Sequence, residues 1–229
     1  MIGAGLAGLT AAGLLAHGTW YRNSWVFGRP LTHLPGAGDV VSITFDDGPN
    51  PDATPRILDV LAREQLSATF FVLGRHAERW PHLVERMAAE GHQLANHGYW
   101  HRKLHRRGPA YIRDDLERGT AAICRASGLT SLRHFRAPHG FRNPWVTPIA
   151  HGLGQRTVGW SLGVWDSARP GADEIARRAL EGLHAGSILL LHDGDGYDAE
   201  GDRLQTADAL PMIIDGLRAR GLRFATLPD

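Results

Sequence analysis

The chain of 229 residues lacks several features that would point to a special environment or partner. Its single cysteine, Cys124, excludes an internal disulfide and lies in a helical pattern, where we expect a small buried apolar side chain. Charge of either sign is not in excess, and the net charge of +1 gives no indication of nucleic-acid or acidic-lipid binding. No internal repeat or low-complexity segment appears. These absences leave an ordinary globular chain that is long enough to bury a full core.

Long hydrophobic runs are also missing, and the longest is the N-terminal stretch IGAGLAGLTAAGLLA, residues 2–16. It is shorter than the roughly 20 residues of a membrane-spanning helix, and it lacks the basic start of a signal peptide. Its Gly3, Gly5 and Gly8 match a dinucleotide-binding pattern, but no strand precedes them, so we exclude a nucleotide site. Two interpretations stay open: a remnant or short form of a membrane anchor or signal segment, and a helix packed on the core.

Residues 1–39 are therefore interpreted as an apolar N-terminal segment with a loop-rich lead-in, followed by one catalytic domain over residues 40–229. Membrane contact through residues 1–16 stays open, and so does the oligomeric state. The apolar segment favours a location in the cell envelope or secretion, with the cytoplasm as the alternative.

Strand and helix patterns alternate along the rest of the chain. Strands are predicted at 40–45, 68–74, 92–98, 134–138, 156–163, 187–194 and 223–227, and helices at 54–64, 76–90, 109–127, 145–152, 171–185 and 204–220. Six strand–helix units and a seventh strand predict an α/β fold with parallel strands. A closed or partly closed (β/α)7 barrel is favoured over an open sheet because residues suited to chemistry end five separate strands.

Those strand ends carry the candidate site. The first strand runs into VSITFDDGPNP, with Asp46 and Asp47 directly before a Gly-Pro breaker. The other strand ends carry His97, His101 and His105, then Arg136 and His139, then Trp160, Trp165 and Asp166, and finally His192. Because the ends of parallel strands share one face, we expect these groups to converge. Taken alone, the paired aspartates would equally suit a surface turn.

A metal site is the first chemistry that this set suggests. His97 and His101 are four residues apart, so a helical turn would direct both rings at one ion. Two imidazoles and one carboxylate form a catalytic type of site, with positions left for water and substrate. The pair His101 and His105 has the same spacing and is the rival. The earlier pair is preferred because His97 directly follows its strand.

Together, four of these motifs resemble the polysaccharide deacetylases of carbohydrate esterase family 4. The matching stretches are TFDDGP, HGYWH, RAPHG and LLHD, and the resemblance covers about residues 40–227 in the family's order. It implies a distorted (β/α)7 barrel, in agreement with the seven predicted strands. It also implies one divalent metal ion, with Zn²⁺ favoured and Co²⁺ or Ni²⁺ as alternatives, and a carbohydrate substrate.

The resemblance further implies a role for each matching residue. Asp47, His97 and His101 would bind the metal, and Asp46 would be the general base. Arg136 would hold Asp46 ionised and oriented. A backbone N–H near His139 would help to stabilise the oxyanion, and His192 would protonate the leaving amine.

The chain departs from the family's fourth motif, which usually has two aspartates followed by a tryptophan. Counted from Trp160, the chain has Gly163, then Asp166 and Ser167, so one acidic position remains. Asp166 is expected to tune His192. The expected substrate-binding residues are His139, Trp160, Trp165 and Leu190, the two tryptophans being equally compatible with core packing. The departure leaves the substrate less certain than the reaction type.

The sequence thus predicts a metal-dependent hydrolase that removes N-acetyl groups from an acetylated amino-sugar oligo- or polysaccharide. One alternative is hydrolysis of O-acetyl esters or non-sugar amides on the same scaffold. The other is a catalytically idle carbohydrate-binding protein, although all the motif residues named above for base, acid and metal are present. The acidic stretch DGDGYDAEGD, residues 193–202, fits a calcium loop poorly and is interpreted as a surface loop at the rim of the cleft.

Overall fold

The computed structural model describes residues 2–36 and 38–228, with side chains from Thr10 onward. Its strands are β1 (Val40–Asp46), β2 (Thr69–Val72), β3 (Gln93–Asn96), β4 (His134–Phe135), β5 (Arg156–Thr157), β6 (Leu162–Gly163), β7 (Ile188–His192) and β8 (Arg223–Phe224). Its helices are α1 (Ile2–Trp20), α2 (Ala53–Arg63), α3 (Gly74–Arg79), α4 (Pro81–Ala89), α5 (Pro109–Ser127), α6 (Val146–Gly152), α7 (Ala172–Gly182) and α8 (Leu204–Ala219), with short 3₁₀ turns at Leu104–Arg106, Pro138–Gly140 and Asp166–Ala168.

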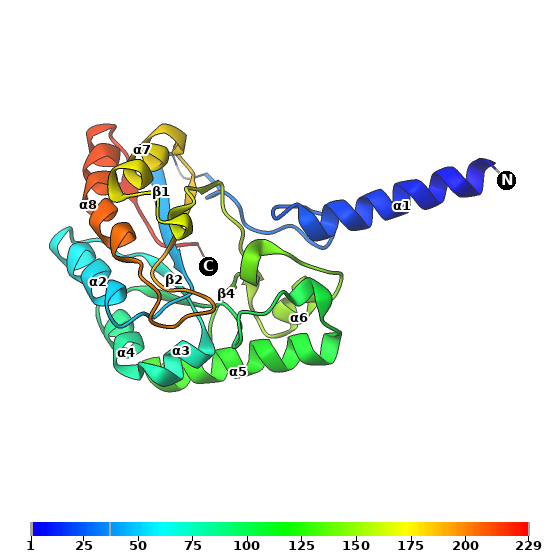
Figure 1. Cartoon of the computed structure of the whole chain (residues 1–229), viewed down its shortest axis with the longest axis horizontal. Helices are drawn as coiled ribbons and strands as arrows, with labels where there is room; N and C mark the ends of the chain where they lie inside the picture. The colour runs from blue at the N-terminus through cyan, green and yellow to red at the C-terminus, as the bar shows by residue number, and fades with distance from the viewer. Residues whose placement is uncertain (1, 37, 229) are drawn as a thin grey trace.

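The sheet is a curled half-barrel of parallel strands, and the predicted α/β barrel class is confirmed. Its order is β5-β4-β3-β2-β1-β7-β6, and β8 pairs with the start of β1. The helices lie around the outside of the strands (Figure 1). β1 occupies the middle and pairs with both β2 and β7, so that Asp46 is the direct register partner of His192. The stretches TFDDGP and LLHD, which are far apart in the sequence, therefore lie side by side in the sheet.

The lead-in forms backbone hydrogen bonds with the end of β5 and the chain that follows it, and with the chain that precedes β7. Leu31 N–H donates to the carbonyl of Thr157 at 2.9 Å, and Gly159 N–H donates to the carbonyl of Leu31 at 2.8 Å. Three residues later, Leu34 N–H donates to the carbonyl of Gly186 at 2.8 Å. Residues 31–34 thus act as a short additional strand between the end of β5 and the start of β7.

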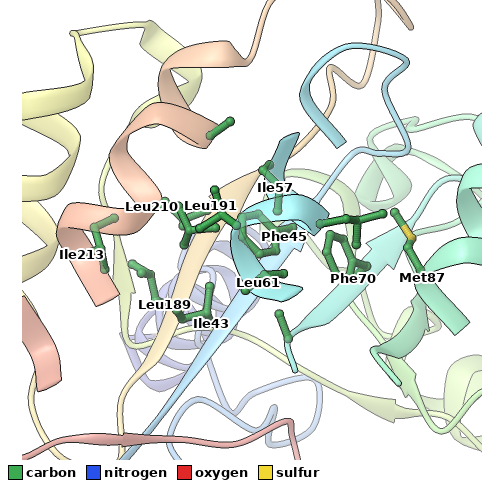
Figure 2. Close-up of a cluster of buried hydrophobic side chains, with 14 of the residues drawn as sticks. Ile43, Phe45, Ile57, Leu61, Phe70, Met87, Leu189, Leu191, Leu210 and Ile213 are labelled. Carbon is green, nitrogen blue, oxygen red and sulfur yellow. The ribbon is translucent and has the colours of Figure 1, made fainter. Parts of the chain in front are cut away.

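The main core lies between the central strands and the helices that cover them. Figure 2 shows Ile43 and Phe45 of β1 packed with Leu189 and Leu191 of β7 and with side chains of α2 and α8. All of β1 after Val40 is buried. Apolar residues on both faces of a strand are expected where helices cover a parallel sheet. Cys124 is only half-buried at the edge of this core, where full burial was expected.

Two predicted elements are divided in the structure. The expected strand 156–163 forms β5 and β6, because its first residues pair with β4 and its last residues with β7. In between, the chain turns to pair with the lead-in at Val158. The expected helix 76–90 is broken before Pro81, which has no N–H to continue α3 and instead begins α4.

The N-terminal helix α1 extends away from the barrel (Figure 1). Its side chains from Thr10 to His17 are exposed, and the first buried residue of the helix is Gly18. The ring of His17 reaches back to the lead-in, with Nδ1 2.9 Å from the Ser24 hydroxyl. Over the side chains described, this contradicts the interpretation of the run as a helix packed on the core. Within the described residues, no helix has both the length and the apolar character needed to cross a membrane.

Candidate metal-dependent active site

A cleft of about 600 Å³ opens at the carboxyl ends of the strands. It is lined by all but one of the residues that the sequence predicted, namely Asp46, Asp47, His97, His101, His139, Trp160, Trp165, Asp166, Leu190 and His192. Arg136 lies fully buried beside it. The chain therefore brings together groups that are up to about 150 residues apart in sequence, as expected for the face where parallel strands end.

Three of these residues form a candidate metal centre. Asp47 Oδ1 lies 3.2 Å from His97 Nε2 and 3.0 Å from His101 Nε2, and all three side chains are buried. A tetrahedral zinc site with bonds of about 2.0–2.1 Å has ligand atoms roughly 3.3 Å apart, so the spacing fits a small divalent ion. Asp47 Oδ1 is buried and accepts no hydrogen bond from the described residues. The donor set therefore fits a divalent cation.

The loop after β3, and not the predicted helical turn, brings the two histidines together. His101 has a left-handed backbone (φ 57°), and the segment from His97 to His101 is not helical. The buried carboxylate of Asp115, on α5, accepts hydrogen bonds from the backbone N–H groups of Tyr99 at 3.2 Å and Trp100 at 3.1 Å. The spacing of four residues identified the correct pair, but the stated geometric reason was wrong.

The rival register, in which His101 and His105 share the metal, is contradicted. The His105 ring packs against Trp20 at 5.0 Å and Phe141 at 5.2 Å between ring centroids. His105 is the middle residue of the short 3₁₀ turn Leu104–Arg106, and the compact cluster contains Asp47, His97 and His101 instead.

Further contacts orient the metal-binding groups. His97 Nδ1 lies 2.9 Å from the carbonyl of Arg136, which leaves Nε2 free for the cluster. His76 Nδ1 lies 2.8 Å from the carbonyl of Asp47. Burial alone raises the pKa of Asp47, but the neighbouring His101 and His97 outweigh it and hold the pKa well below its usual range. Asp47 is therefore an ionised ligand.

Asp46 is held beside this cluster by Arg136. One oxygen, Oδ1, accepts a hydrogen bond from Arg136 Nη1 at 2.6 Å, and the other, Oδ2, lies 3.8 Å from His97 Nε2. Arg136 also donates to Thr44 Oγ1 and to the carbonyl of Gly159, and its guanidinium lies 3.9 Å from the Phe71 ring centroid. The salt bridge fixes one oxygen of Asp46 and leaves the other at the cleft.

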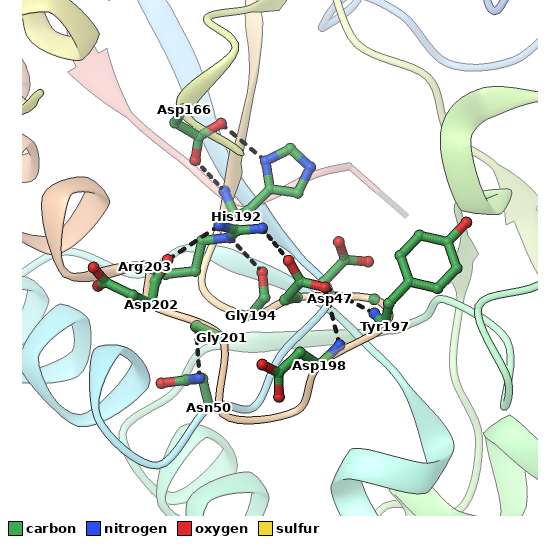
Figure 3. Close-up of polar contacts among 12 residues, drawn as sticks. Asp47, Asn50, Asp166, His192, Gly194, Tyr197, Asp198, Gly201, Asp202 and Arg203 are labelled. Atoms are coloured by element: carbon green, nitrogen blue, oxygen red, sulfur yellow. Dashed lines mark hydrogen bonds and ion pairs between the residues drawn. The ribbon is translucent and has the colours of Figure 1, made fainter. Parts of the chain in front are cut away.

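A second Asp–His pair faces the cleft from β7. Asp166 Oδ1 lies 2.9 Å from His192 Nδ1, and Asp166 Oδ2 accepts a hydrogen bond from the His192 backbone N–H at 2.7 Å (Figure 3). Asp166 Oδ2 also accepts a hydrogen bond from Thr206 Oγ1 at 2.9 Å. Burial alone lowers the pKa of His192, but the charge and hydrogen bond of Asp166 outweigh it and raise the pKa to about 9. His192 is therefore held in its protonated form at the cleft.

The acidic loop of residues 193–203 borders the cleft. Arg203 anchors it by donating to the carbonyl of Gly194 at 2.8 Å and to Asp195 at 2.6 Å (Figure 3). The loop carries Tyr197, whose hydroxyl lies 2.9 Å from His139 Nε2. It also brings Gly196 so close to the His101 ring that any side chain at position 196 would overlap it.

Sequence reasoning did not point to four residues that shape or line the cleft: Asp115, Arg203, Tyr197 and, from the lead-in, Arg22. An acidic residue at a buried position of an otherwise amphipathic helix was the available signal for Asp115. The other three come from loops, where the pattern of the sequence does not determine which side chain reaches a strand end. Their positions depend on tertiary contacts that have no local signature.

Comparison with known proteins agrees with this geometry. Residues 34–158 match the family model described as polysaccharide deacetylase. A chitooligosaccharide deacetylase of Bradyrhizobium sp. (strain ANU 289) is 41% identical over 82% of this chain and 89% of that enzyme. A peptidoglycan-N-acetylglucosamine deacetylase of Bacillus cereus is 34% identical over 86% of this chain and 90% of that enzyme.

The solved structure of a family 4 carbohydrate esterase from Streptomyces lividans in complex with acetate is also similar. It superposes with a TM-score of 0.75 at 28% identity, over 85% of this chain and 100% of that chain. The chain belongs to the polysaccharide deacetylase family, carbohydrate esterase family 4, and it carries the buried Asp-His-His cluster that is typical of the divalent metal site in this family.

Proposed function

We propose that this protein removes N-acetyl groups from an acetylated amino-sugar oligo- or polysaccharide, a chitooligosaccharide or the N-acetylglucosamine of peptidoglycan. The relatives that act on these substrates cover most of the chain. The observation that carries the proposal is the position of Asp46 and His192 as register partners at one edge of the metal cluster. One group can accept a proton and the other can donate one within a single cleft.

The metal-binding residues would be Asp47, His97 and His101, and Zn²⁺ is the favoured ion because two imidazoles and a carboxylate suit it. When bound, the ion supplies Lewis-acid polarisation of the acetamide carbonyl and lowers the pKa of water.

The chain's own residues divide the proton transfers. Asp46 takes a proton from the attacking water through Oδ2, while Arg136 holds Oδ1 by a hydrogen bond of 2.6 Å. His192 gives a proton to the departing amine, and Asp166 holds the ring through Nδ1 so that Nε2 faces the cleft. A C–O bond forms to the carbonyl carbon and the C–N bond breaks, which yields acetate and a free amino sugar.

Apolar and aromatic side chains shape the rest of the cleft. Leu190, Trp160 and Trp165 line it on the side of β6 and β7, and we propose that they receive the methyl of the acetyl group. The ring of His139 lies 4.5 Å from that of His101 between centroids, so the turn that carries His139 is close to the metal cluster. This supports the proposal that a backbone N–H in this turn stabilises the oxyanion.

The test is acetate release from N-acetyl and O-acetyl glycans by the wild type, Asp46→Asn and His192→Ala, with metal content measured in each. Asp46→Asn keeps the shape of the side chain and should lower turnover about 10²–10⁴-fold with the metal retained. His192→Ala should have a similar effect on an amide and a much smaller one on an aryl acetate, whose leaving group needs no proton.

Other results of this experiment would favour the alternative functions. Release from O-acetyl substrates alone would identify an esterase, and no release from any substrate would identify an idle binding protein. Full activity of Asp46→Asn would refute the proposed role of Asp46 as general base.

A further inference from the structure

The lead-in places a cation in the cleft that the proposed reaction does not use. Arg22 follows α1 and lines the cleft, far in sequence from every motif residue. Its guanidinium carbon lies 5.2 Å from the ring centroid of Trp165, 5.7 Å from that of Trp160 and 6.0 Å from that of Phe141. The side chain is half-buried among aromatic rings. Such a position strengthens the interaction of a cation with an incoming anion because little water screens it.

The backbone around Arg22 is held firmly against the barrel. Arg142, 2% exposed, donates to the carbonyls of Arg22 at 3.4 Å and Gly28 at 3.0 Å, and also to that of Ser24. The side-chain amide of Asn23 donates to the carbonyl of Trp160 at 2.7 Å. The stem of Arg22 lies so close to Gly140 that a methyl group there would stand 3.0 Å from it. Arg22 is therefore preorganised rather than free to leave the cleft.

The charges of the cleft leave Arg22 without a counterion. Four carboxylates line the cleft, and each has a partner within the chain. Asp46 pairs with Arg136, and Asp47 lies against the two histidines of the metal cluster. Asp166 pairs with His192, and Asp195 pairs with Arg203. In the part of the chain whose side chains are described, no acidic group pairs with the Arg22 guanidinium. The fork of Arg22 therefore has hydrogen-bond donors available for a group that the substrate brings.

We propose that Arg22 is a specificity-determining residue that binds a carboxylate carried by the glycan beside the acetylated amino sugar. The inference rests on the proposed function. A planar carboxylate matches the guanidinium fork, whereas a neutral sugar hydroxyl would use only one of its donors. Lys103, which is exposed and also lines the cleft, adds a second positive charge to the same cleft. Two sources share this chemistry: a lactyl ether on a neighbouring amino sugar, and a neighbouring uronic acid.

The experiment compares four N-acetylglucosamine oligosaccharides of equal length. One is neutral chitotetraose, one alternates with N-acetylmuramic acid, one is the same glycan with its carboxylates converted to methyl esters, and one alternates with glucuronic acid. Acetate release gives kcat/KM, and calorimetry gives Kd in parallel. The proteins are the metal-loaded wild type, Arg22→Gln, Arg22→Lys and, as a matched control, Arg29→Gln, which removes an exposed cation from the same lead-in.

We expect the wild type to prefer one of the carboxylate glycans over the neutral ones by about tenfold, the size of one charge-assisted contact. Arg22→Gln should lose that preference and stay within about twofold of the wild type on chitotetraose, Arg22→Lys should keep part of it, and Arg29→Gln should keep all of it. The preference should also shrink as the salt concentration rises. Which of the two acidic glycans is preferred identifies the source of the carboxylate.

Equal losses of Arg22→Gln on acidic and neutral glycans, or no loss on either, would overturn the inference, as would equal use of the acid and its methyl ester by the wild type. If no glycan released acetate, the proposed function would fail, and the Kd values would still decide the role of Arg22. A preference for the acid in Kd that Arg22→Gln abolishes would support it, and its absence would overturn it.

Discussion

Two Asp–His groupings line the cleft, and they differ in how their hydrogen bonds are used. Asp166 accepts three hydrogen bonds and holds His192 by Nδ1, so every acceptor in that pair has a donor. At the other grouping, Asp47 Oδ1 is buried without a hydrogen bond and faces the Nε2 atoms of His97 and His101. The same residue types therefore suit two purposes: the satisfied pair fixes the orientation of one imidazole, and the unsatisfied cluster has the arrangement of a cation site.

Removing a metal ligand should have the largest effect on this contrast. His97→Ala should lose the bound metal and lower acetate release by more than about 10³-fold, because activation of water depends on the ion. His105→Ala should keep the bound metal and the acetate release, since the ring of His105 packs against Trp20 and Phe141 in the wild type. Elemental analysis of both variants beside the wild type provides the measurement. Equal metal content in wild type and His97→Ala would refute the assignment of the cluster.

A smaller effect should come from crowding the unsatisfied cluster without replacing any of its three residues. A methyl group in Gly196→Ala would overlap the ring of His101 and displace it. We expect metal affinity to fall about 10–100-fold, as for other changes behind a metal ligand. Titration against a competing chelator measures this, and Gly152→Ala, where a methyl group meets no atom within 4 Å, is the control. Unchanged metal affinity in Gly196→Ala would show that the loop of residues 193–203 moves and the ring of His101 stays in place.

The satisfied pair can be tested through the pH dependence of turnover. In Asp166→Asn, the negative charge that favours protonated His192 is gone, so the pKa of His192 should fall from about 9. The alkaline limb of kcat should move to lower pH by about 1–3 units, the usual effect of one adjacent charge. A bound divalent cation also lowers this pKa, so both proteins must carry the same metal.

The control is Asp173→Asn, a change at an exposed position of α7, which should leave the alkaline limb of kcat at the same pH. A limb that does not move in Asp166→Asn would mean that another group sets it.

The smallest effect on turnover should come from deleting residues 1–16, whose described side chains are exposed. We expect unchanged kcat and a melting temperature within about 2 °C of the full chain. Deletion of residues 1–38 should behave differently, because Leu31 and Leu34 are buried in the barrel. Loss of two buried leucines, at about 1.5–3 kcal/mol each, should lower the melting temperature by roughly 10 °C. Equal melting temperatures for both deletions would show that the lead-in contributes nothing.

The sequence predicted most of the barrel and most of the cleft because both depend on local pattern. Strand ends follow from apolar runs that stop at Gly, Pro or paired acids, and parallel strands bring those ends together. This reasoning placed Asp46, Asp47 and His192 correctly. It failed where the outcome depends on distant partners. The bend that brings His101 to Asp47 is held by Asp115 on another helix, and the division of 156–163 depends on the lead-in.

The pairing of the lead-in with the barrel has a consequence for synthesis of the chain. The backbone of Leu31 bonds to Thr157, and the backbone of Leu34 bonds to Gly186. Residues 31–34 therefore cannot complete their pairing until about 150 more residues have been made. At roughly 5–20 residues per second, this pairing waits about 8–30 s on the ribosome. Unpaired edges invite association with other chains during that time. Fast translation, or a chaperone that covers residues 31–34, should therefore raise the yield of soluble protein more than it changes the stability of the finished molecule.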